Sequence, residues 1–381
     1  MVAEPGTVNR SIEDARSSGD DISSDPRYDD RSMDIRFDRH GPLAIVTLDR
    51  VQALNALTLD MAERLDRRLI EWASDPAVAV VAIRSAGGRA FCAGGDIRAL
   101  YDAGRRNDPY AADFYRVEYR LNHRIKTFGK PYVALLDGIT MGGGVGLSIH
   151  GSHRVVTDRC QFAMPETGIG FFPDVGGSWF LPRCPGTLGT YLGLTGARLG
   201  AADMLYCGLA THYVSSDDVA ALPGVLERGV HADAVEALLD RRARDPGPAP
   251  LAQYRPAIDR CFAAESVEEI LARLDGEGTP WARETASVLR RKSPTSLKVT
   301  MRQLQAGATL ESFVAAMRME YRLARHFMTA PDFYEGVRAA VIDRDQAPHW
   351  QPASLKEVSD AVVARYFEPL GEPDRELLED S

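Results

Sequence analysis

Between Met33 and Thr157 the sequence alternates short apolar runs with segments of helical periodicity. The apolar runs predict strands at residues 34–38, 43–48, 78–84, 132–136 and 153–157. The periodic segments predict helices at residues 59–72, 109–127 and 142–148, the first of them capped by Thr58. Strands that alternate with helices need crossover connections, so this pattern predicts an α/β fold.

The chain is expected to have four parts. Residues 1–33 are rich in Ser, Asp and Arg without apolar periodicity and are interpreted as a disordered leader. The α/β core is expected over residues 34–214, with a soft boundary near Val214. Helical patterns dominate residues 215–352, and the segment 296–340 is expected to be helical throughout. Residues 353–381 are interpreted as a tail.

Charge and apolar content exclude several classes of partner. The formal net charge is -9, from 45 basic and 54 acidic side chains, so most of the surface would repel nucleic acid. The longest clean apolar run, Ala77 to Ile83, is far below the roughly 20 residues needed to cross a bilayer. The 5 cysteines are scattered without CxxC spacing, which favours a reducing compartment. The use of Arg over Lys is typical of a GC-rich bacterial genome, so a cytoplasmic location is expected.

Common cofactor and catalytic motifs do not fit this chain. The Gly-rich run at 142–144 lacks the third glycine of a dinucleotide fingerprint, because Leu147 stands at that position. No P-loop, HExxH pair or GxSxG elbow occurs. His150 and His153 are three residues apart without a carboxylate nearby in the sequence, which is a weak metal signal. Neither a metal site nor a redox cofactor is therefore expected.

Two Gly-rich loops, at residues 88–97 and 142–144, each follow a predicted strand. Small residues let the backbone approach a ligand closely, and a helix that begins there leaves amide N–H groups unpaired. Two such amides aimed at one point would form an oxyanion hole, which stabilises the charge that develops on an attacked carbonyl oxygen. Each loop alone is equally consistent with an ordinary tight turn.

The stretch from Met164 to Gly177 carries two carboxylates, Glu166 and Asp174, in an otherwise apolar, Gly- and Pro-rich segment. Burial beside aromatic residues would raise the pKa of a carboxyl and remove its water, as a base or nucleophile requires. A solvated surface loop explains the same residues equally well. The residues alone assign a role to neither carboxylate.

Three stretches, GRAFCAGGDIR, KPYVALLDGITMGGGVGLSIHG and FAMPETGIGFFPDVGGSWFLPR, resemble the enoyl-CoA hydratase/isomerase (crotonase) superfamily. Within it, they resemble the branch of 3-hydroxyisobutyryl-CoA hydrolases. The resemblance extends over about residues 35–352 and includes the late stretches 332–339 and 342–346. It implies a crotonase-like spiral of β-β-α units followed by a helical C-terminal region that covers the active site.

The resemblance also implies roles for single residues. Gly95 and Gly143 would supply the oxyanion amides, while Glu166 and Asp174 would be the catalytic carboxylates. Glu118 would border the acyl pocket. The residues expected along the coenzyme A path are Ala53, Asn55, Ala93, Asp96 and Ile97.

One departure from the family pattern bears on the reaction. Hydratases of this superfamily use a second glutamate three residues after the oxyanion glycine, where this chain has Gly146. The resemblance therefore implies hydrolysis of a short 3-hydroxyacyl-CoA, in first place 3-hydroxyisobutyryl-CoA from valine breakdown. Glu166 would either attack the thioester or deprotonate a water, and both routes stay open.

Two other functions are consistent with the same sequence. The chain could be an enoyl-CoA hydratase or isomerase, or a non-catalytic crotonase-like subunit of an assembly. No cofactor is expected, since coenzyme A is part of the substrate. Relatives in the superfamily often form trimers and hexamers, so a homo-oligomer is expected.

Overall fold

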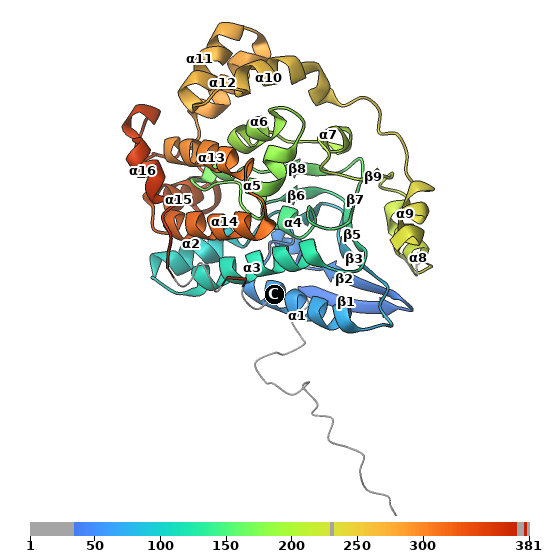
Figure 1. Cartoon of the computed structure of the whole chain (residues 1–381). Helices are drawn as coiled ribbons and strands as arrows, with labels where there is room; N and C mark the ends of the chain where they lie inside the picture. The colour runs from blue at the N-terminus through green and yellow to red at the C-terminus, as the bar shows by residue number, and fades with distance from the viewer. Residues whose placement is uncertain (1–33, 229–231, 372–376, 379–381) are drawn as a thin grey trace, which may run out of the picture. The chain divides into compact units, whose positions relative to one another are not determined.

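Two sheets form the centre of the computed structural model, which describes residues 34–228, 232–371 and 377–378 (Figure 1). In this part of the chain the larger sheet has the strand order β1-β2-β3-β5-β7-β9 and the smaller one the order β4-β6-β8. The strands are β1 (Ile35–His40), β2 (Leu43–Leu48), β3 (Val80–Ser85), β4 (Ala90–Cys92), β5 (Tyr132–Leu136), β6 (Ile139–Met141), β7 (His153–Val156), β8 (Gln161–Ala163) and β9 (His212–Tyr213).

The strands follow a repeating order along the chain. β3, β5 and β7 enter the larger sheet, and the strand after each of them enters the smaller one. All pairings are parallel except the β1–β2 hairpin, where Ile35 lies opposite Leu48. Helices follow each pair of strands, and this is the β-β-α spiral that the resemblance implied. The predicted α/β fold class is confirmed.

Helices surround the sheets and dominate the second half of the chain (Figure 1). The α-helices of the described part are α1 (Leu59–Ser74), α2 (Ile97–Arg105), α3 (Tyr110–Thr127), α4 (Gly143–Gly146), α5 (Gly177–Phe180), α6 (Leu188–Thr195), α7 (Ala201–Tyr206), α8 (Leu222–Leu226), α9 (Ala232–Asp240), α10 (Arg255–Phe262), α11 (Val267–Glu277), α12 (Pro280–Arg290), α13 (Pro294–Gly307), α14 (Phe313–Phe327), α15 (Pro331–Val337) and α16 (Asp360–Arg365).

The predicted cap of the first helix is present, whereas the helical segment predicted over residues 296–340 is divided. Thr58 caps α1 as predicted, accepting a hydrogen bond from the Met61 amide at 3.2 Å. The expectation of one continuous helix over 296–340 is wrong. Turns after Gly307 and Phe327 divide it into α13, α14 and α15, and Pro331 begins the last of them because proline suits only the first turn of a helix. The predicted leader lies outside the described residues.

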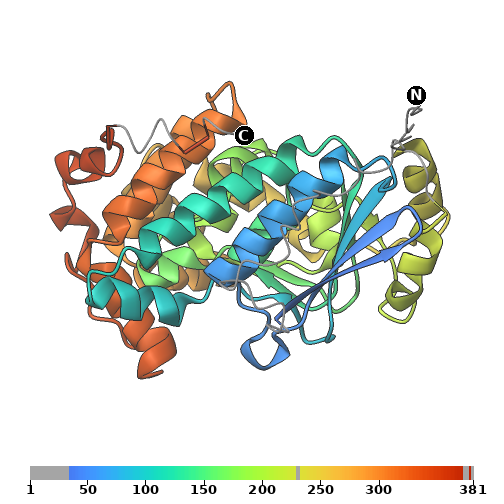
Figure 2. The same cartoon turned by 90° about the horizontal axis from the view of Figure 1, so that it is seen from below.

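The larger sheet separates two clusters of buried side chains. Along β2, Ala44, Val46 and Leu48 face the main core, whereas Leu43 and Ile45 face a smaller one, as the alternation of a strand requires. Figure 2 shows α1 and α3 running side by side along the sheet, with α8 and α9 apart from them. Apolar residues of α8 and α9 complete the smaller cluster, whereas the main core holds the Gly-rich loops.

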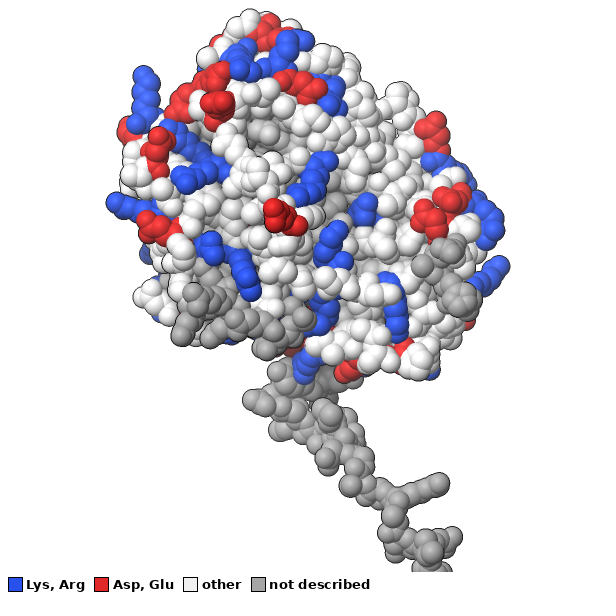
Figure 3. Space-filling model, in the orientation of Figure 1, with Lys and Arg blue, Asp and Glu red and all other residues white. Residues whose placement is uncertain are grey.

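On the face seen in Figure 3, basic and acidic side chains are interspersed, and basic ones predominate through its centre. No helix of the described part is long and apolar enough to cross a membrane.

Candidate active site

A cavity of about 130 Å3 lies where the two Gly-rich loops meet α3 and the segment after β8. Five expected catalytic or acyl-pocket residues, far apart in sequence, line it together: Gly95, Glu118, Gly143, Glu166 and Asp174. Apolar and aromatic side chains from α2, α3, β6 and the segment after β8 form much of its wall: Ile97, Leu100, Phe114, Tyr115, Met141, Ile169 and Phe171. The cavity is thus a small, largely apolar chamber with carboxylates at its wall.

The amides of Gly95 and Gly143 are arranged as the oxyanion prediction requires. In the parallel bridge between Leu57 and Gly95, the Leu57 amide donates to the Gly94 carbonyl and the Asp96 amide donates to the Leu57 carbonyl. The N–H of Gly95 itself therefore points away from Leu57. Gly143 is the first residue of α4, and the first N–H groups of a helix have no acceptor within it. A Cβ on Gly143 would lie 3.2 Å from the Gly95 nitrogen, so the two amides are adjacent. Both positions are too crowded for a side chain, because a Cβ on Gly95 would lie 3.0 Å from the Phe114 ring and one on Gly143 would lie 2.7 Å from Glu118 Oε1.

The three carboxylates of the cavity are almost completely buried. The exposed fractions are 2% for Glu118, 6% for Glu166 and 5% for Asp174, so the surface-loop interpretation of the 164–177 stretch is wrong. Asp174 Oδ2 accepts a hydrogen bond from the Tyr119 hydroxyl at 2.9 Å. Within the part of the chain that the structure describes, Glu166 Oε2 and Glu118 Oε1 have no hydrogen-bond partner. A buried carboxylate without a partner is costly, and such a group is typical of a site that awaits a ligand.

Burial changes the acidity of this cluster. It raises the pKa of Glu166, and the nearby charge of Asp174 raises it further. Burial and the charge of Asp174 also raise the pKa of Glu118. Burial raises the pKa of Asp174 to about 7, although the hydrogen bond from Tyr119 lowers it. Lys292, just before α13, is a nearby cation. Burial lowers its pKa to about 8, although the negative charge of Glu166 acts in the opposite direction and raises it. Sequence analysis identified neither Tyr119 nor Lys292.

These shifts predict the pH dependence of any reaction that needs ionised Glu166. We expect kcat/KM to keep rising with pH well above the ordinary glutamate pKa of about 4.3, because burial and the charge of Asp174 raise the pKa of Glu166. Asp174→Asn removes a negative charge that raises the pKa of Glu166, so the acidic limb should move to lower pH. Profiles of kcat/KM against pH for both proteins test this, and an unmoved limb would contradict the assignment.

The loop that carries Asp174 is held by the C-terminal helices. Val175 has φ +48°, a left-handed conformation that is strained for a β-branched residue. On α14, Glu320 accepts hydrogen bonds from the Gly176 and Ser178 amides at 2.7 and 2.8 Å. On α13, Gln303 Nε2 donates to the Pro173 carbonyl at 2.7 Å. The helical region therefore fixes the position of Asp174, a role for Glu320 that sequence analysis missed.

We expect Glu320→Ala to lower the free energy of unfolding by about 2–6 kcal/mol, since two buried amides lose their acceptor and each unpaired group costs about 1–3 kcal/mol. Denaturant unfolding measures this, with Glu311→Ala as the matched control because Glu311 is exposed. Equal stability of the two variants would show that Glu320 does not hold the loop.

The residues expected along the coenzyme A path divide into two groups. Ala93 and Ile97 line the cavity, whereas Ala53, Asn55 and Asp96 do not. Asn55 is buried and donates to the carbonyls of Ala90 and Phe91, both at 3.0 Å. Asp96 caps α2 and pairs with Arg50 at 2.8 Å. These two side chains shape the loop that presents Gly95, and a direct contact with coenzyme A remains a prediction.

The position of Gly146, where hydratases carry a second glutamate, is crowded. A Cβ on Gly146 would lie 2.7 Å from Asn122 Nδ2 and 2.9 Å from the Val175 Cβ. Contacts below 3.0 Å do not occur for real Cβ atoms, and the Val175 atom belongs to a short, stiff side chain. The strained Asp174 loop thus occupies the space that a side chain at 146 would need.

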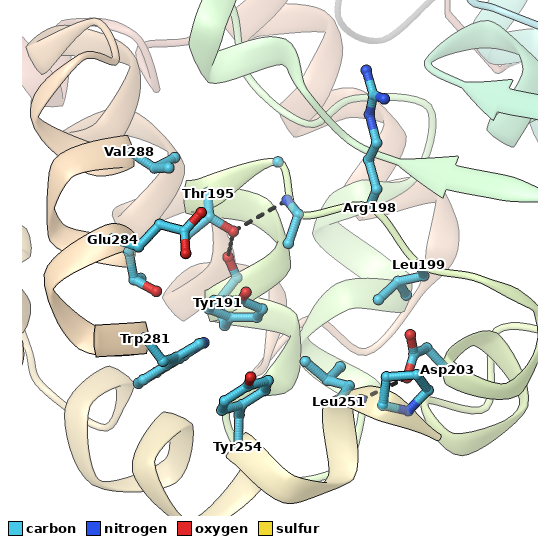
Figure 4. Close-up of a pocket in the computed structure, with 14 residues that line it drawn as sticks. Tyr191, Thr195, Arg198, Leu199, Asp203, Leu251, Tyr254, Trp281, Glu284 and Val288 are labelled. Atoms are coloured by element: carbon cyan, nitrogen blue, oxygen red, sulfur yellow. Dashed lines mark hydrogen bonds between the residues drawn. The ribbon is translucent and has the colours of Figure 1, made fainter. Parts of the chain in front are cut away.

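A larger cavity, of about 430 Å3, lies between α6 and α12 and holds none of the residues discussed so far (Figure 4). Its wall includes Tyr191, Tyr254 and Trp281, and the rings of the last two stack with centroids 5.5 Å apart. Two acidic residues line it: Asp203 already accepts a hydrogen bond from the Leu251 amide at 2.8 Å, and Glu284 is exposed to solvent. The smaller cavity, with its unpartnered carboxylates, is therefore the candidate active site.

Comparisons with known proteins agree with this geometry. The family described as enoyl-CoA hydratase/isomerase matches residues 43–367. A Gallus gallus protein named 3-hydroxyisobutyryl-CoA hydrolase, mitochondrial, is 45% identical over 359 residues, which cover 92% of this chain and 93% of that protein.

Two solved structures are also similar. A carnitinyl-CoA dehydratase from Mycobacterium thermoresistibile has a TM-score of 0.85 and 40% identity over 89% of this chain and 97% of its own. An enoyl-CoA hydratase from Rhodobacter sphaeroides has a TM-score of 0.83 and 41% identity, and the match covers 89% of this chain and 98% of that protein. The chain belongs to the enoyl-CoA hydratase/isomerase (crotonase) family, in the branch of the 3-hydroxyisobutyryl-CoA hydrolases.

Proposed function

We propose that this chain hydrolyses short 3-hydroxyacyl-CoA thioesters, in first place 3-hydroxyisobutyryl-CoA, as in valine catabolism. The observation that carries the proposal is the buried carboxylate of Glu166 beside the two oxyanion amides. A Cβ on Gly142 would lie 3.4 Å from Glu166 Oε1, which places this carboxylate against the loop of Gly143. The name of the Gallus gallus relative agrees with this reaction.

In the proposed mechanism the thioester carbonyl oxygen accepts hydrogen bonds from the Gly95 and Gly143 amides. In one route Glu166 attacks the carbonyl carbon, the C–S bond breaks, and water then hydrolyses the resulting mixed anhydride. In the other, Glu166 takes a proton from water, whose oxygen attacks the same carbon. Both routes release the free hydroxy acid and coenzyme A, and the departing thiolate takes up a proton.

The small chamber suits a short acyl group. Its volume is about 130 Å3, and Phe114, Tyr115 and Phe171 limit it. Asp174 and Glu118 are among the polar side chains that line this wall and could contact a 3-hydroxyl. We propose that Asp174 orients this hydroxyl, positions the water or helps to protonate the leaving thiolate.

A second candidate function, hydration of an enoyl-CoA, is raised by the names of the two solved structures. Syn addition of water in hydratases uses two glutamates, and the crowded position of Gly146 speaks against a second one. The deciding test is a panel of 3-hydroxyisobutyryl-, 3-hydroxypropionyl-, isobutyryl- and crotonyl-CoA. Thiol release from the first two supports the hydrolase, consumption of crotonyl-CoA without thiol release supports the hydratase, and no turnover at all supports a non-catalytic subunit.

The reaction as proposed needs no metal or cofactor. Its residues are carboxylates and backbone amides, and a cytoplasmic homo-oligomer, a trimer or hexamer, is proposed for the working enzyme. Light scattering of the purified full chain measures the oligomeric state, and fractionation of the source cells measures the location.

We expect N-ethylmaleimide and EDTA to leave thioester hydrolysis unchanged. All 5 cysteines are buried, and burial raises the pKa of the nearest one, Cys92, to about 12, so little thiolate is available to react. The proposed chemistry also uses no metal-bound water. Thiol-release assays before and after each treatment test this, and loss of activity that one particular metal restores would contradict the mechanism.

A further inference from the structure

Figure 1 shows α9 beside the strands β7 and β9 of the larger sheet. A second cluster of ionisable side chains joins these elements through contacts of His153 and His212 with α9. Val155 pairs with His212 across the two strands, so His153, two residues before Val155, faces the same side as His212. Glu236 and Asp240 are four residues apart on α9 and therefore share one face of that helix.

The distances within this cluster suit a metal ion. His212 Nε2 lies 3.3 Å from Asp240 Oδ1 and 3.8 Å from Glu236 Oε1. One ligand atom from each of the three residues lies within 4.8 Å of the others. Two ligands that each bind a tetrahedral ion at about 2.0–2.1 Å are about 3.3–3.4 Å apart. The three side chains thus need only small shifts to bind one ion.

The hydrogen bonds of His212 are compatible with either tautomer. Nε2 lies 3.3 Å from Asp240 Oδ1, which can only accept, so without a metal Nε2–H can donate to this carboxylate. A bound ion would take the place of that proton if the other nitrogen, Nδ1, carries the remaining one. The Nδ1 atom of His212 lies 2.8 Å from the Thr211 hydroxyl. This hydroxyl donates its own proton to the Arg154 carbonyl at 3.1 Å. The hydroxyl can therefore accept a hydrogen bond from Nδ1–H, and in that tautomer of the neutral ring Nε2 carries no proton. A histidine that binds a metal through one nitrogen commonly has its other N–H fixed in this way.

His153 contacts the oxygen of the Glu236 carboxylate that does not face His212. Its Nε2 lies 2.7 Å from Glu236 Oε2, and its Nδ1 lies 2.8 Å from the Ser152 hydroxyl. An Nε2–H donor here leaves the other carboxylate oxygen, Oε1, turned toward His212. His153 is then a positioning residue, of the kind that commonly orients a carboxylate ligand.

We propose that His212, Glu236 and Asp240 bind a divalent transition-metal ion such as Zn²⁺, with water as the fourth ligand. An imidazole nitrogen with carboxylates favours this class over Ca²⁺ and Mg²⁺, which prefer oxygen ligands. The His212 side chain is 4% exposed while the two carboxylates are 56% and 64% exposed, so an ion can enter from solvent onto a buried ligand.

Such an ion would fasten α9 to the sheet. Val235 and Leu239 of α9 pack in the smaller core cluster with Val155 of β7. The bound metal would add a link between the same elements at the edge of that cluster. The site shares no residue with the candidate active site, so its loss should change the stability of the protein and leave turnover intact.

The test is a titration of the EDTA-stripped full chain with Zn²⁺ by calorimetry, together with thermal unfolding and the visible spectrum of the Co²⁺ form. We expect one Zn²⁺ per chain, a raised unfolding midpoint and an intense tetrahedral Co²⁺ spectrum. Asp240→Asn and His212→Gln should weaken binding by at least about tenfold, and His153→Gln by about 10–100-fold. Glu311→Gln, an exposed carboxylate between α13 and α14, is the matched control and should bind as the parent does.

An unchanged Zn²⁺ affinity in the Asp240→Asn variant would overturn the proposal, as would the absence of binding to the folded parent chain. The exposed position of Asp240 makes this variant safe for folding, and circular dichroism of each variant confirms that it is folded. A cluster held by a proton alone would give no Co²⁺ spectrum and no Zn²⁺ stabilisation. Thioester hydrolysis is measured in parallel, so that failure of the metal site and failure of the proposed function are distinguished.

Discussion

Glu166→Gln should abolish thioester hydrolysis while leaving the affinity for the coenzyme A thioester near that of the parent. The amide keeps the size of the carboxylate but neither attacks a carbonyl nor accepts a proton, and loss of a general base alone costs about 10²–10⁴ in rate. The Glu166 carboxylate is buried with one oxygen unpartnered, so water cannot easily take its place. Thiol-release kinetics give kcat, and calorimetry with a non-hydrolysable thioester analogue gives the affinity.

The matched control is Glu335→Gln. Glu335 is a carboxylate of α15 that forms an ion pair with Arg338 at 2.8 Å and lies outside the cavity lining. It should retain hydrolysis. Near-parental turnover in a folded Glu166→Gln protein would remove Glu166 from the mechanism under both routes.

Gly143→Pro should slow every thioester alike. Proline removes the N–H assigned to the oxyanion hole, and the loss of one such donor costs about 2.7–4 kcal/mol, or roughly 10²–10³ in rate. Its ring would also enter the cavity, because even a Cβ at this position would lie 2.7 Å from Glu118 Oε1. The helix itself tolerates the change, since proline suits the first position of a helix.

Two variants separate these effects. Gly143→Ala keeps the N–H but adds the Cβ, so it measures the steric cost alone. Gly200→Ala, where the structure leaves open space for a Cβ, controls for the loss of a glycine. A folded Gly143→Pro enzyme that turns over normally would show that the oxyanion hole lies elsewhere.

Asp174→Asn should fail differently. If Asp174 contacts the 3-hydroxyl, this variant should discriminate less between 3-hydroxyisobutyryl-CoA and isobutyryl-CoA, whereas the Gly143→Pro enzyme should keep the parental preference. The ratio of kcat/KM for the two substrates measures this for both variants. An unchanged ratio in the Asp174→Asn variant would show that Asp174 does not contact the 3-hydroxyl of the substrate.

The short strands of the smaller sheet show where local sequence signals were too weak. β4, β6 and β8 have three residues each, and they lie beside Gly-rich turns that the sequence marks only as loops. A strand of three residues is stabilised by its neighbours in the sheet and carries too little periodicity of its own. Their pairing nevertheless brings the two Gly-rich loops together, since β4 and β6 end beside each other.

Sequence by itself determined the longer elements and the family. The β1–β2 hairpin, Thr58 at the start of α1 and the strands β3, β5 and β7 follow from local patterns, because turn residues, caps and apolar periods act over a few residues. The motif residues Gly95, Gly143, Glu166 and Asp174 came from the resemblance, and the structure places all four at one cavity. Their assigned roles remain predictions.

Only the tertiary structure decided which groups act on one another. Tyr119 on α3 reaches Asp174 across 55 residues, Glu320 reaches the Gly176 amide across 144, and Glu236 on α9 meets His153 of β7. Such partners carry no spacing signal, since the distance along the chain is unrelated to the contact in space. Burial is decided in the same way. A carboxylate has the same intrinsic pKa wherever it stands in a sequence, and its acidity changes only when folded chain replaces the water around it.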